Sequence, residues 1–174
     1  MKLTGKKIFI RLLAPDDVTQ EYVNWMRDQE IVQFLESRWR ISTLEDIKAY
    51  VTQMNNSPND FLFGIFLLDS GEHVGNIKIG NINQIHRFGE VGFIIGNKKA
   101  WGKGIATEAI ELATRYAFED LNLNKLIAGI YMENIGSYKA LLKMGYREIG
   151  IMKKQRFCKG KYMDEYLVEK CRDD

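Results

Sequence analysis

The sequence contains little cysteine, proline or histidine, and each shortage excludes a class of protein. Two cysteines, Cys158 and Cys171, in 174 residues are too few for a disulfide scaffold, and they favour a reducing compartment. Two prolines and 15 glycines exclude a collagen-like or low-complexity chain. The cysteines and the two histidines, His73 and His86, lack the spacing of metal ligands, so we expect no metal site.

Long apolar runs are also missing. No apolar stretch approaches the ~18 residues of a membrane helix, and residues 1–8 lack the apolar core of a signal peptide, so we expect a cytoplasmic protein. The hydrophobic fraction of 45% is too high for disorder, and we expect residues 1–174 to form one domain. A formal net charge of +2 argues against a nucleic-acid partner.

The modest net charge hides a basic cluster near the C-terminus. Between Lys139 and Lys161, eight Lys and Arg residues stand against one acid, Glu148. The cluster is either a solvated face or a site for a phosphorylated ligand or an acidic acceptor. In the second case Lys143 is the best candidate for a phosphate contact.

Hydrophobic periodicity predicts an α+β fold. We expect helices after Pro15, over 43–54, over 104–121, and from an N-cap at Asn134 to Met144. Strands are expected at residues 7–13, 61–68, 74–82, 88–95, 126–131, 146–155 and 162–170. This order predicts a mixed, mostly antiparallel sheet of about seven strands flanked by about four helices.

Glycines cluster where the strand at 88–95 meets the helix at 104–121. Glycines just before a helix let backbone N–H groups converge on an anion such as a pyrophosphate, although they also occur in simple tight turns. A P-loop is excluded because five residues separate Gly96 from Gly102 and because Gly104 replaces the hydroxyl residue. A dinucleotide-binding fingerprint is excluded because Thr107 replaces its third glycine.

Two segments together resemble one family. Residues 101–109, WGKGIATEA, resemble the acyl-coenzyme A pyrophosphate loop of the GNAT N-acetyltransferase superfamily, in the variant typical of its ribosomal-protein N-acetyltransferase branch. Residues 134–137 with 143–146 are similar to the second coenzyme A segment of that family, and the resemblance extends from Ile8 to Val168. The family usually has Gln or Arg where this sequence has Lys99, so a cation is kept but the guanidinium fork is lost.

The resemblance implies acetyl-coenzyme A as a co-substrate, with GNAT-like topology. It implies that backbone groups of residues 93–95 hold the pantetheine arm and the thioester oxygen. Asn134 can contact the coenzyme, cap a helix, or do both. The expected coenzyme-binding residues are Phe93, Ile94, Ile95, Lys99, Trp101, Gly102, Lys103, Gly104, Ile105, Ala106, Thr107, Asn134 and Lys143.

Acetyl transfer to an amine needs a base and a proton donor. We assign the base to Glu90, which lies in a strand among apolar neighbours, and the resemblance implies the same; an exposed ion-paired strand position is the alternative. For the donor we prefer Ser137, which matches the serine of the ribosomal-protein branch, with Tyr138 or solvent as alternatives. Leu141 occupies the position where many family members have a tyrosine.

The acceptor pocket is expected from the first two helices, their loop and the last strand pair. Its candidates are Trp25, Phe34, Trp39, Arg40, Tyr162 and Asp164. Trp25 and Phe34 could equally be core residues. Arg38, Trp39 and Arg40 form a charged loop that could hold a carboxylate or phosphate of the acceptor.

These observations favour an N-acetyltransferase that moves acetyl to a primary amine by direct attack, because no serine lies in a nucleophile elbow and no Cys/His pair is indicated. We expect a small-molecule or peptide acceptor, for example a protein N-terminal amine or an amino-sugar nucleotide, and a monomer or homodimer. Aminoglycosides and polyamines remain alternatives, and the shortage of an acidic patch disfavours polyamines. A catalytically silent acyl-coenzyme A sensor is the alternative of another class.

Overall fold

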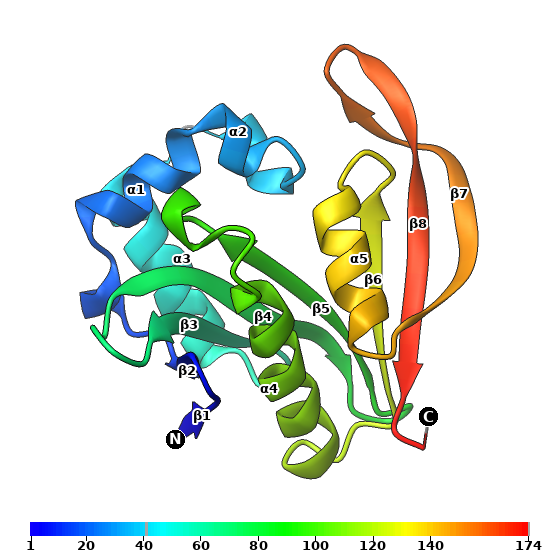
Figure 1. The fold of residues 1–174 in the computed structure, drawn as a ribbon, viewed down its shortest axis with the longest axis horizontal. Helices are drawn as coiled ribbons and strands as arrows, with labels where there is room; N and C mark the ends of the chain where they lie inside the picture. The colour runs from blue at the N-terminus through cyan, green and yellow to red at the C-terminus, as the bar shows by residue number, and fades with distance from the viewer. Residues whose placement is uncertain (41, 174) are drawn as a thin grey trace.

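The computed structural model describes residues 1–40 and 42–173, and within them eight strands form one mixed, mostly antiparallel sheet (Figure 1). Their order across the sheet is β1-β2-β3-β4-β5-β6-β8-β7, and only β5 and β6 pair in parallel. The strands are β1 (Lys2–Thr4), β2 (Ile8–Leu12), β3 (Phe61–Leu67), β4 (His73–Asn83), β5 (Phe88–Ile95), β6 (Lys125–Tyr131), β7 (Arg147–Cys158) and β8 (Lys161–Cys171).

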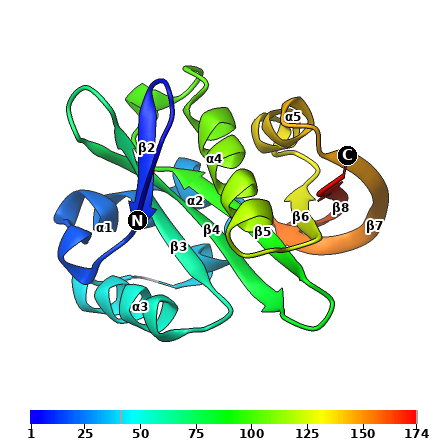
Figure 2. The same ribbon diagram turned by 90° about the horizontal axis from the view of Figure 1, so that it is seen from below.

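Helices cover both faces of the sheet. The helices in the described residues are α1 (Gln20–Arg27), α2 (Gln29–Val32), α3 (Leu44–Asn56), α4 (Ile105–Glu119) and α5 (Ile135–Lys143). Helices α4 and α5 lie on one face, and α1 and α3 lie on the other (Figure 2). In the part of the chain that the structure describes, no helix is both long and apolar enough to cross a membrane.

The two faces have separate hydrophobic clusters. The larger one joins α4 and α5 to the sheet and contains the fully buried Ile77, Ile110 and Leu126. The smaller one joins α1 and α3 to β2 and β3 around Trp25 and Val51. Side chains alternate between the two faces along each strand, so neighbouring residues of β5 serve different faces.

The sheet opens between β5 and β6. Only three residues of each strand pair, Phe88–Glu90 with Lys125–Ile127, and beyond them the two strands have no common ladder. Residues 91–95 of β5 remain paired with β4 on their other side. The β6 side of this segment therefore presents main-chain groups that no strand satisfies.

The sheet ends at β7, and this edge is irregular. The β7–β8 register shifts between Glu148 and Gly150 and again between Met152 and Arg156. Most β7 residues are exposed. Near the second irregularity Lys154 has a φ of 51°, a left-handed conformation that breaks a regular ladder.

Most predicted elements are confirmed, and the differences have local causes. β5 has its predicted bounds, and Asn134 caps α5 by accepting from the Ser137 N–H at 3.3 Å. The helix expected after Pro15 begins only at Gln20, because residues 15–17 form a 3₁₀ turn and the Thr19 side chain caps α1. β1 and α2, of three and four residues, were not predicted because each is shorter than the periodicity that would reveal it.

His73, the first residue of β4, lies largely buried beneath α1. Its ring stacks on Phe66 with ring centres 4.9 Å apart, and its edge meets Trp25 at 5.1 Å. Nε2 donates to the Asn76 Oδ1 at 2.9 Å, whereas Nδ1 has no partner among the described residues. Burial lowers the pKa of His73, because protonation would place a charge among aromatic rings.

We expect this histidine to make stability depend on pH. The unfolded chain binds a proton near the ordinary histidine pKa of 6.5, whereas the folded protein binds it only at lower pH. The stabilisation is therefore complete above pH 6.5 and is lost as the pH falls through the lowered pKa. Two charged groups act on the ring, Asp17, which favours protonation, and Arg11, which opposes it.

Urea unfolding between about pH 7 and about pH 5 tests this expectation. In His73→Gln the free energy of unfolding should fall less with pH than in the unsubstituted protein. His86→Gln changes the exposed histidine of the β4–β5 loop and should keep the full pH dependence. If His73→Gln and the unsubstituted protein show equal slopes, the expectation is wrong.

Candidate functional site

The glycine turn before α4 is built to present N–H groups. Gly102 has a φ of 71° and Gly104 a φ of 80°, both left-handed values that glycine adopts without strain. Gly104 is the N-cap of α4 and supplies no side-chain acceptor. The first N–H groups of a 15-residue helix therefore lack a side-chain cap, and the helix dipole adds to their attraction for an anion.

The opening between β5 and β6 lies beside this turn. The indole Nε1 of Trp101 donates to the Ile95 carbonyl oxygen at 2.8 Å, which joins the end of β5 to the turn. Gly96 allows this path, because a Cβ there would overlap the Trp25 ring. An extended ligand with amide groups can thus pair with the free edge of β5 while its phosphates reach the turn.

Helix α5 supplies the other wall. Ser137, in its first turn, lines the cavity and donates its N–H to the Asn134 side chain. The hydroxyl of Tyr138 instead donates to the Glu148 Oε2 at 2.7 Å, and its ring stacks on Tyr166 with centres 4.4 Å apart. Bonding to Glu148 raises the pKa of Tyr138. Of the two candidate donors, only Ser137 faces the cavity.

These three parts enclose a cavity of about 590 Å³. All the residues predicted to bind coenzyme line it except Lys99 and Lys103. The lining residues predicted from sequence are Phe93, Ile94, Ile95, Trp101, Gly102, Gly104, Ile105, Ala106, Thr107, Asn134, Ser137 and Lys143. The size and the uncapped N–H groups fit the pantetheine and pyrophosphate of coenzyme A.

Sequence reasoning missed the wall formed by α2 and the residues after it. Glu30, Ile31, Gln33 and Leu35 line the cavity, together with the predicted Phe34. Lys98 holds this wall against the turn after β5 by ion pairs to Asp28 at 2.7 Å and to Glu30 at 2.6 Å. The sequence signal for α2 was Asp28, because aspartate is a preferred N-cap residue. In the structure its side chain caps α2 by accepting from the Glu30 N–H at 2.9 Å.

Glu90 stands at the point where β5 and β6 separate. Its pairing partner is Ile127, the last β6 residue of the parallel ladder, and its side chain faces away from α4. Glu90 is exposed rather than enclosed by apolar neighbours, and its Oε2 accepts from the Asn81 Nδ2 at 3.0 Å. A water molecule has access to this carboxylate, which suits a base that acts through water.

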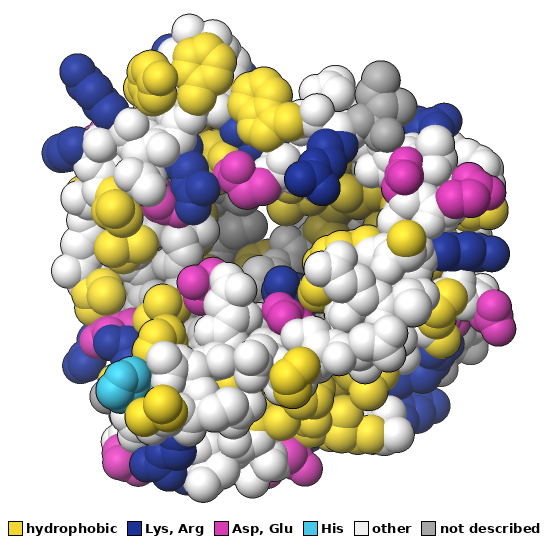
Figure 3. Space-filling view, turned by 180° about the vertical axis from the view of Figure 1, so that it is seen from behind, with side chains coloured by type: hydrophobic (Ala, Val, Ile, Leu, Met, Phe, Trp, Pro, Cys, Tyr) yellow, Lys and Arg dark blue, Asp and Glu magenta, His cyan; other side chains and the backbone are white. Residues whose placement is uncertain are grey.

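The face that carries Glu90 is open at its centre. A Cβ at Gly92, two residues along β5, would have no atom within 4 Å. Figure 3 shows that this face is hollowed near its middle and that acidic side chains stand at the edge of the hollow. Glu90 and Gly92 belong to the same strand as residues 93–95, which line the cavity beside the glycine turn.

The predicted acceptor residues occupy different environments. Phe34 lines the cavity and packs against Tyr131 with ring centres 5.7 Å apart. Trp25 is only 3% exposed and belongs to the hydrophobic core, so it cannot contact an acceptor in this conformation. Trp39 is 61% exposed and stacks on Phe157.

The remaining candidates lie farther along the loop and on the β7–β8 pair. Tyr162 packs in a T-shaped arrangement against Phe157 with ring centres 5.2 Å apart, and Arg40 is exposed next to Trp39. Asp164 binds the Lys153 ammonium at 2.8 Å and the Lys154 N–H at 2.9 Å.

Arg38, expected to hold an anionic acceptor, instead fixes the loop. Its guanidinium donates to the carbonyl oxygens of Leu35 at 2.6 Å and Phe157 at 2.7 Å and to the Tyr131 hydroxyl at 2.9 Å. With these bonds made, Arg38 is a structural link between the loop and β7. Of the two arginines in this loop, Arg40 stays the candidate for binding an anionic acceptor.

Further charged groups are paired next to the loop that Arg38 fixes. The Tyr131 hydroxyl donates to Glu36, and burial followed by this bond raises the pKa of Tyr131. Arg156 bridges Glu36 at 3.1 Å and the buried Glu165 at 2.6 Å. A Cβ at Gly129 would overlap the Glu165 carboxylate, so the glycine makes room for the charge on β8.

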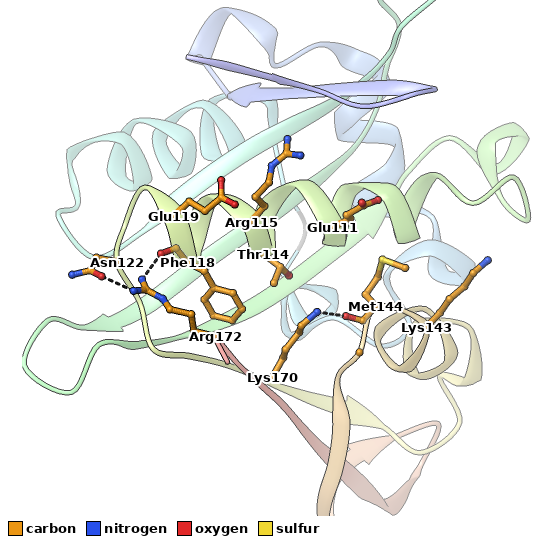
Figure 4. A pocket seen from close by; sticks show the side chains of 11 residues that line it. Glu111, Thr114, Arg115, Phe118, Glu119, Asn122, Lys143, Met144, Lys170 and Arg172 are labelled. Carbon is orange, nitrogen blue, oxygen red and sulfur yellow. Dashed lines mark hydrogen bonds between the residues drawn. The ribbon is translucent and has the colours of Figure 1, made fainter. Parts of the chain in front are cut away.

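A second hollow, of about 990 Å³, lies between the ends of α4 and α5 (Figure 4). Two of its cations are used structurally: Lys170 donates to the Met144 carbonyl oxygen at 2.6 Å, and Arg172 donates to the Phe118 carbonyl oxygen and to the Asn122 side chain. Both therefore stabilise helix C-termini. Among the described residues, no group of three or more His, Cys, Asp or Glu side chains is arranged to hold a metal ion.

Comparison with known proteins agrees with this geometry. A family model described as an acetyltransferase (GNAT) domain matches residues 7–147. The N-acetyltransferase YnaD of Bacillus subtilis is 30% identical over 166 residues, which are 95% of this chain and 94% of that protein. Spermidine N(1)-acetyltransferase of Escherichia coli is 36% identical over 92 residues, which are 53% of this chain and 49% of that protein.

Solved structures show the same fold. A GNAT-family acetyltransferase from Bacillus anthracis superposes with a TM-score of 0.86 over 100% of both chains at 24% identity. Spermidine N-acetyltransferase from Vibrio cholerae, in complex with CoA and spermine, superposes with a TM-score of 0.86 over 97% of this chain and 98% of that one at 22% identity.

The glycine turn can be tested with a matched pair of substitutions. Gly102 and Gly71, which lies in the β3–β4 turn, share a φ of 71°, and a Cβ at either position would have no atom within 4 Å. Valine strains either site, by roughly 1–3 kcal/mol. We expect Gly102→Val to weaken coenzyme A binding at least about tenfold, because the N–H groups no longer converge, and Gly71→Val to leave it unchanged. Calorimetric titration measures both, and equal affinities would contradict the assignment of the turn.

Proposed function

The chain belongs to the GNAT family of acetyltransferases, and from this premise we propose that it transfers acetyl from acetyl-coenzyme A to a primary amine that enters from the face of the sheet opposite α4. The observation that carries the proposal is the opening between β5 and β6. Residues 93–95 on the β5 side of this opening line the cavity beside the glycine turn, and Glu90 lies where the opening begins, on the face of the sheet opposite α4.

The chain's own groups account for binding. N–H groups at the start of α4 hold the pyrophosphate, and the free edge of β5 pairs with the pantetheine amides. Lys139 and Lys143 of α5 line the same cavity and supply positive charge for phosphates. Bound acetyl-coenzyme A supplies an activated acyl group on a thiol leaving group.

The transfer itself requires a proton to be removed and another to be supplied. The amine nitrogen forms a bond to the carbonyl carbon as the carbon–sulfur bond breaks, and the electron pair of that bond stays on sulfur. Glu90 accepts the proton of the amine through a water molecule, and Ser137 donates a proton to the thiolate and regains one from solvent. An N–H on the free edge of β5 stabilises the oxyanion.

For the acceptor, the first candidate is a protein N-terminal α-amine. It is supported by the resemblance of residues 101–109 and of Ser137 to the ribosomal-protein N-acetyltransferase branch. An α-amine has an ordinary pKa of about 7.7–8.0, so Glu90 can deprotonate it at little cost near neutral pH.

The second candidate is a polyamine. It is supported by the likeness to spermidine N(1)-acetyltransferase and by the acidic side chains at the edge of the hollow. Carboxylates beside a concave entrance attract a multiply charged cation. An anionic amino-sugar nucleotide is less well supported, because Arg38 is committed to the loop.

Two measurements test the proposal. Acetyl-coenzyme A at 100 times its dissociation constant should stabilise the fold by about 2.7 kcal/mol, a rise in Tm of roughly 5–10 °C at this size. Thiol release should then appear with N-terminal peptides or with polyamines. Stabilisation without release across both classes would identify a binding module, and no stabilisation would contradict coenzyme binding itself.

We expect Glu90→Gln to lower kcat about a hundredfold at neutral pH and to leave coenzyme affinity unchanged. The loss should shrink as the pH approaches the amine's own pKa, because less of the amine then needs a base. Glu45→Gln, an exposed position at the start of α3, is the matched control and should keep full activity. An unchanged pH–rate profile in Glu90→Gln would assign the base to another group.

A further inference from the structure

The N-terminal hairpin is docked on the first turn of α4, about 100 residues away in sequence. The Glu108 carboxylate accepts the backbone N–H groups of Lys6 and of Lys7, the latter at 3.0 Å. A Cβ at Gly5 would overlap this carboxylate, so glycine permits the contact. The turn between β1 and β2 therefore lies directly against the helix that begins at the glycine turn.

From this position Lys7 reaches the glycine turn itself. Its Nζ donates to the Lys103 carbonyl oxygen at 2.8 Å. In a trans peptide the C=O and the following N–H point in opposite directions, so the contact turns the Gly104 N–H away from Lys7. Gly102, Gly104 and Ile105 line the coenzyme cavity, whereas Lys7 and Lys103 do not. The Gly104 N–H is therefore directed to the cavity side.

The positive charge of Lys7 lies close to the N-terminus of α4. Its ammonium lies 3.8 Å from the place of a Cβ on Gly104, the N-cap of α4. A cation beside a helix N-terminus opposes the helix dipole, so helix stability alone does not favour it. An anion bound at the same N-terminus reverses this balance, because it is attracted by the dipole and by the ammonium together.

We propose that Lys7 is a positioning residue for the phosphates of the coenzyme, which it assists by orienting the Lys103–Gly104 peptide and by adding positive charge behind the turn. The proposal rests on the proposed function, since it needs coenzyme A in this cavity. The N-terminal hairpin, distant in sequence from both coenzyme segments, is thereby part of the phosphate site.

Lys7→Met tests the role, with Lys6→Met as its matched control. Lys6 is exposed in the same turn, and within the described residues its ammonium makes no hydrogen bond or ion pair. Both variants lose one charge and keep their backbone bonds to Glu108. We expect Lys7→Met to weaken coenzyme A binding about tenfold in calorimetric titration, Lys6→Met less than about twofold, and Lys7→Arg to recover most of the loss.

A second acetyl donor distinguishes a role of Lys7 in positioning the phosphates from a general effect of the substitution on the structure. S-acetylpantetheine carries the thioester but no phosphate, so its kcat/KM should stay within about twofold in Lys7→Met while that for acetyl-coenzyme A falls about tenfold. Equal losses with the two donors, or an unchanged affinity for coenzyme A, would overturn the proposal. If Lys7→Met does not fold, Lys7→Gln takes its place with the same expectations. Failure of the unsubstituted protein to bind coenzyme A would instead overturn the proposed function.

Discussion

The candidate site depends on one constraint, the very short parallel ladder between β5 and β6. After three residue pairs the strands separate, and the sheet can tolerate the gap because β4 and β8 hold them on their outer sides. The unpaired edge of β5 would be costly in a closed core, since buried main-chain groups need partners. Beside an open cavity it becomes the wall that a ligand with amide groups can complete.

Most of the basic cluster predicted near the C-terminus serves the protein itself. Arg156 binds Glu36 and Glu165, while Lys159 and Lys161 share Glu133. Two other members, Lys139 and Lys143, line the cavity beside the glycine turn. Of the two interpretations, a solvated face and a site for a phosphorylated ligand, the second stays a proposal for Lys139 and Lys143.

The sequence predicted well what local chemistry determines. The bounds of β5, a glycine turn before the long helix and the Asn134 cap follow from residue types and their spacing. It predicted poorly what depends on distant partners. Arg38 next to Trp39 indicated an anion site, but a sequence does not show that Tyr131 and the Phe157 carbonyl would bind that guanidinium. The α2 wall was missed because four residues carry no periodicity.

The irregular course of β7 has a consequence for how the molecule behaves among other chains. A long, regular edge strand offers its free N–H and C=O groups as a template for another strand, and this leads to aggregation. Here two register shifts and the left-handed Lys154 interrupt the template, and adjacent Lys153 and Lys154 place charge on it. The same strand that completes the sheet is thus protected against extending it into a neighbouring molecule.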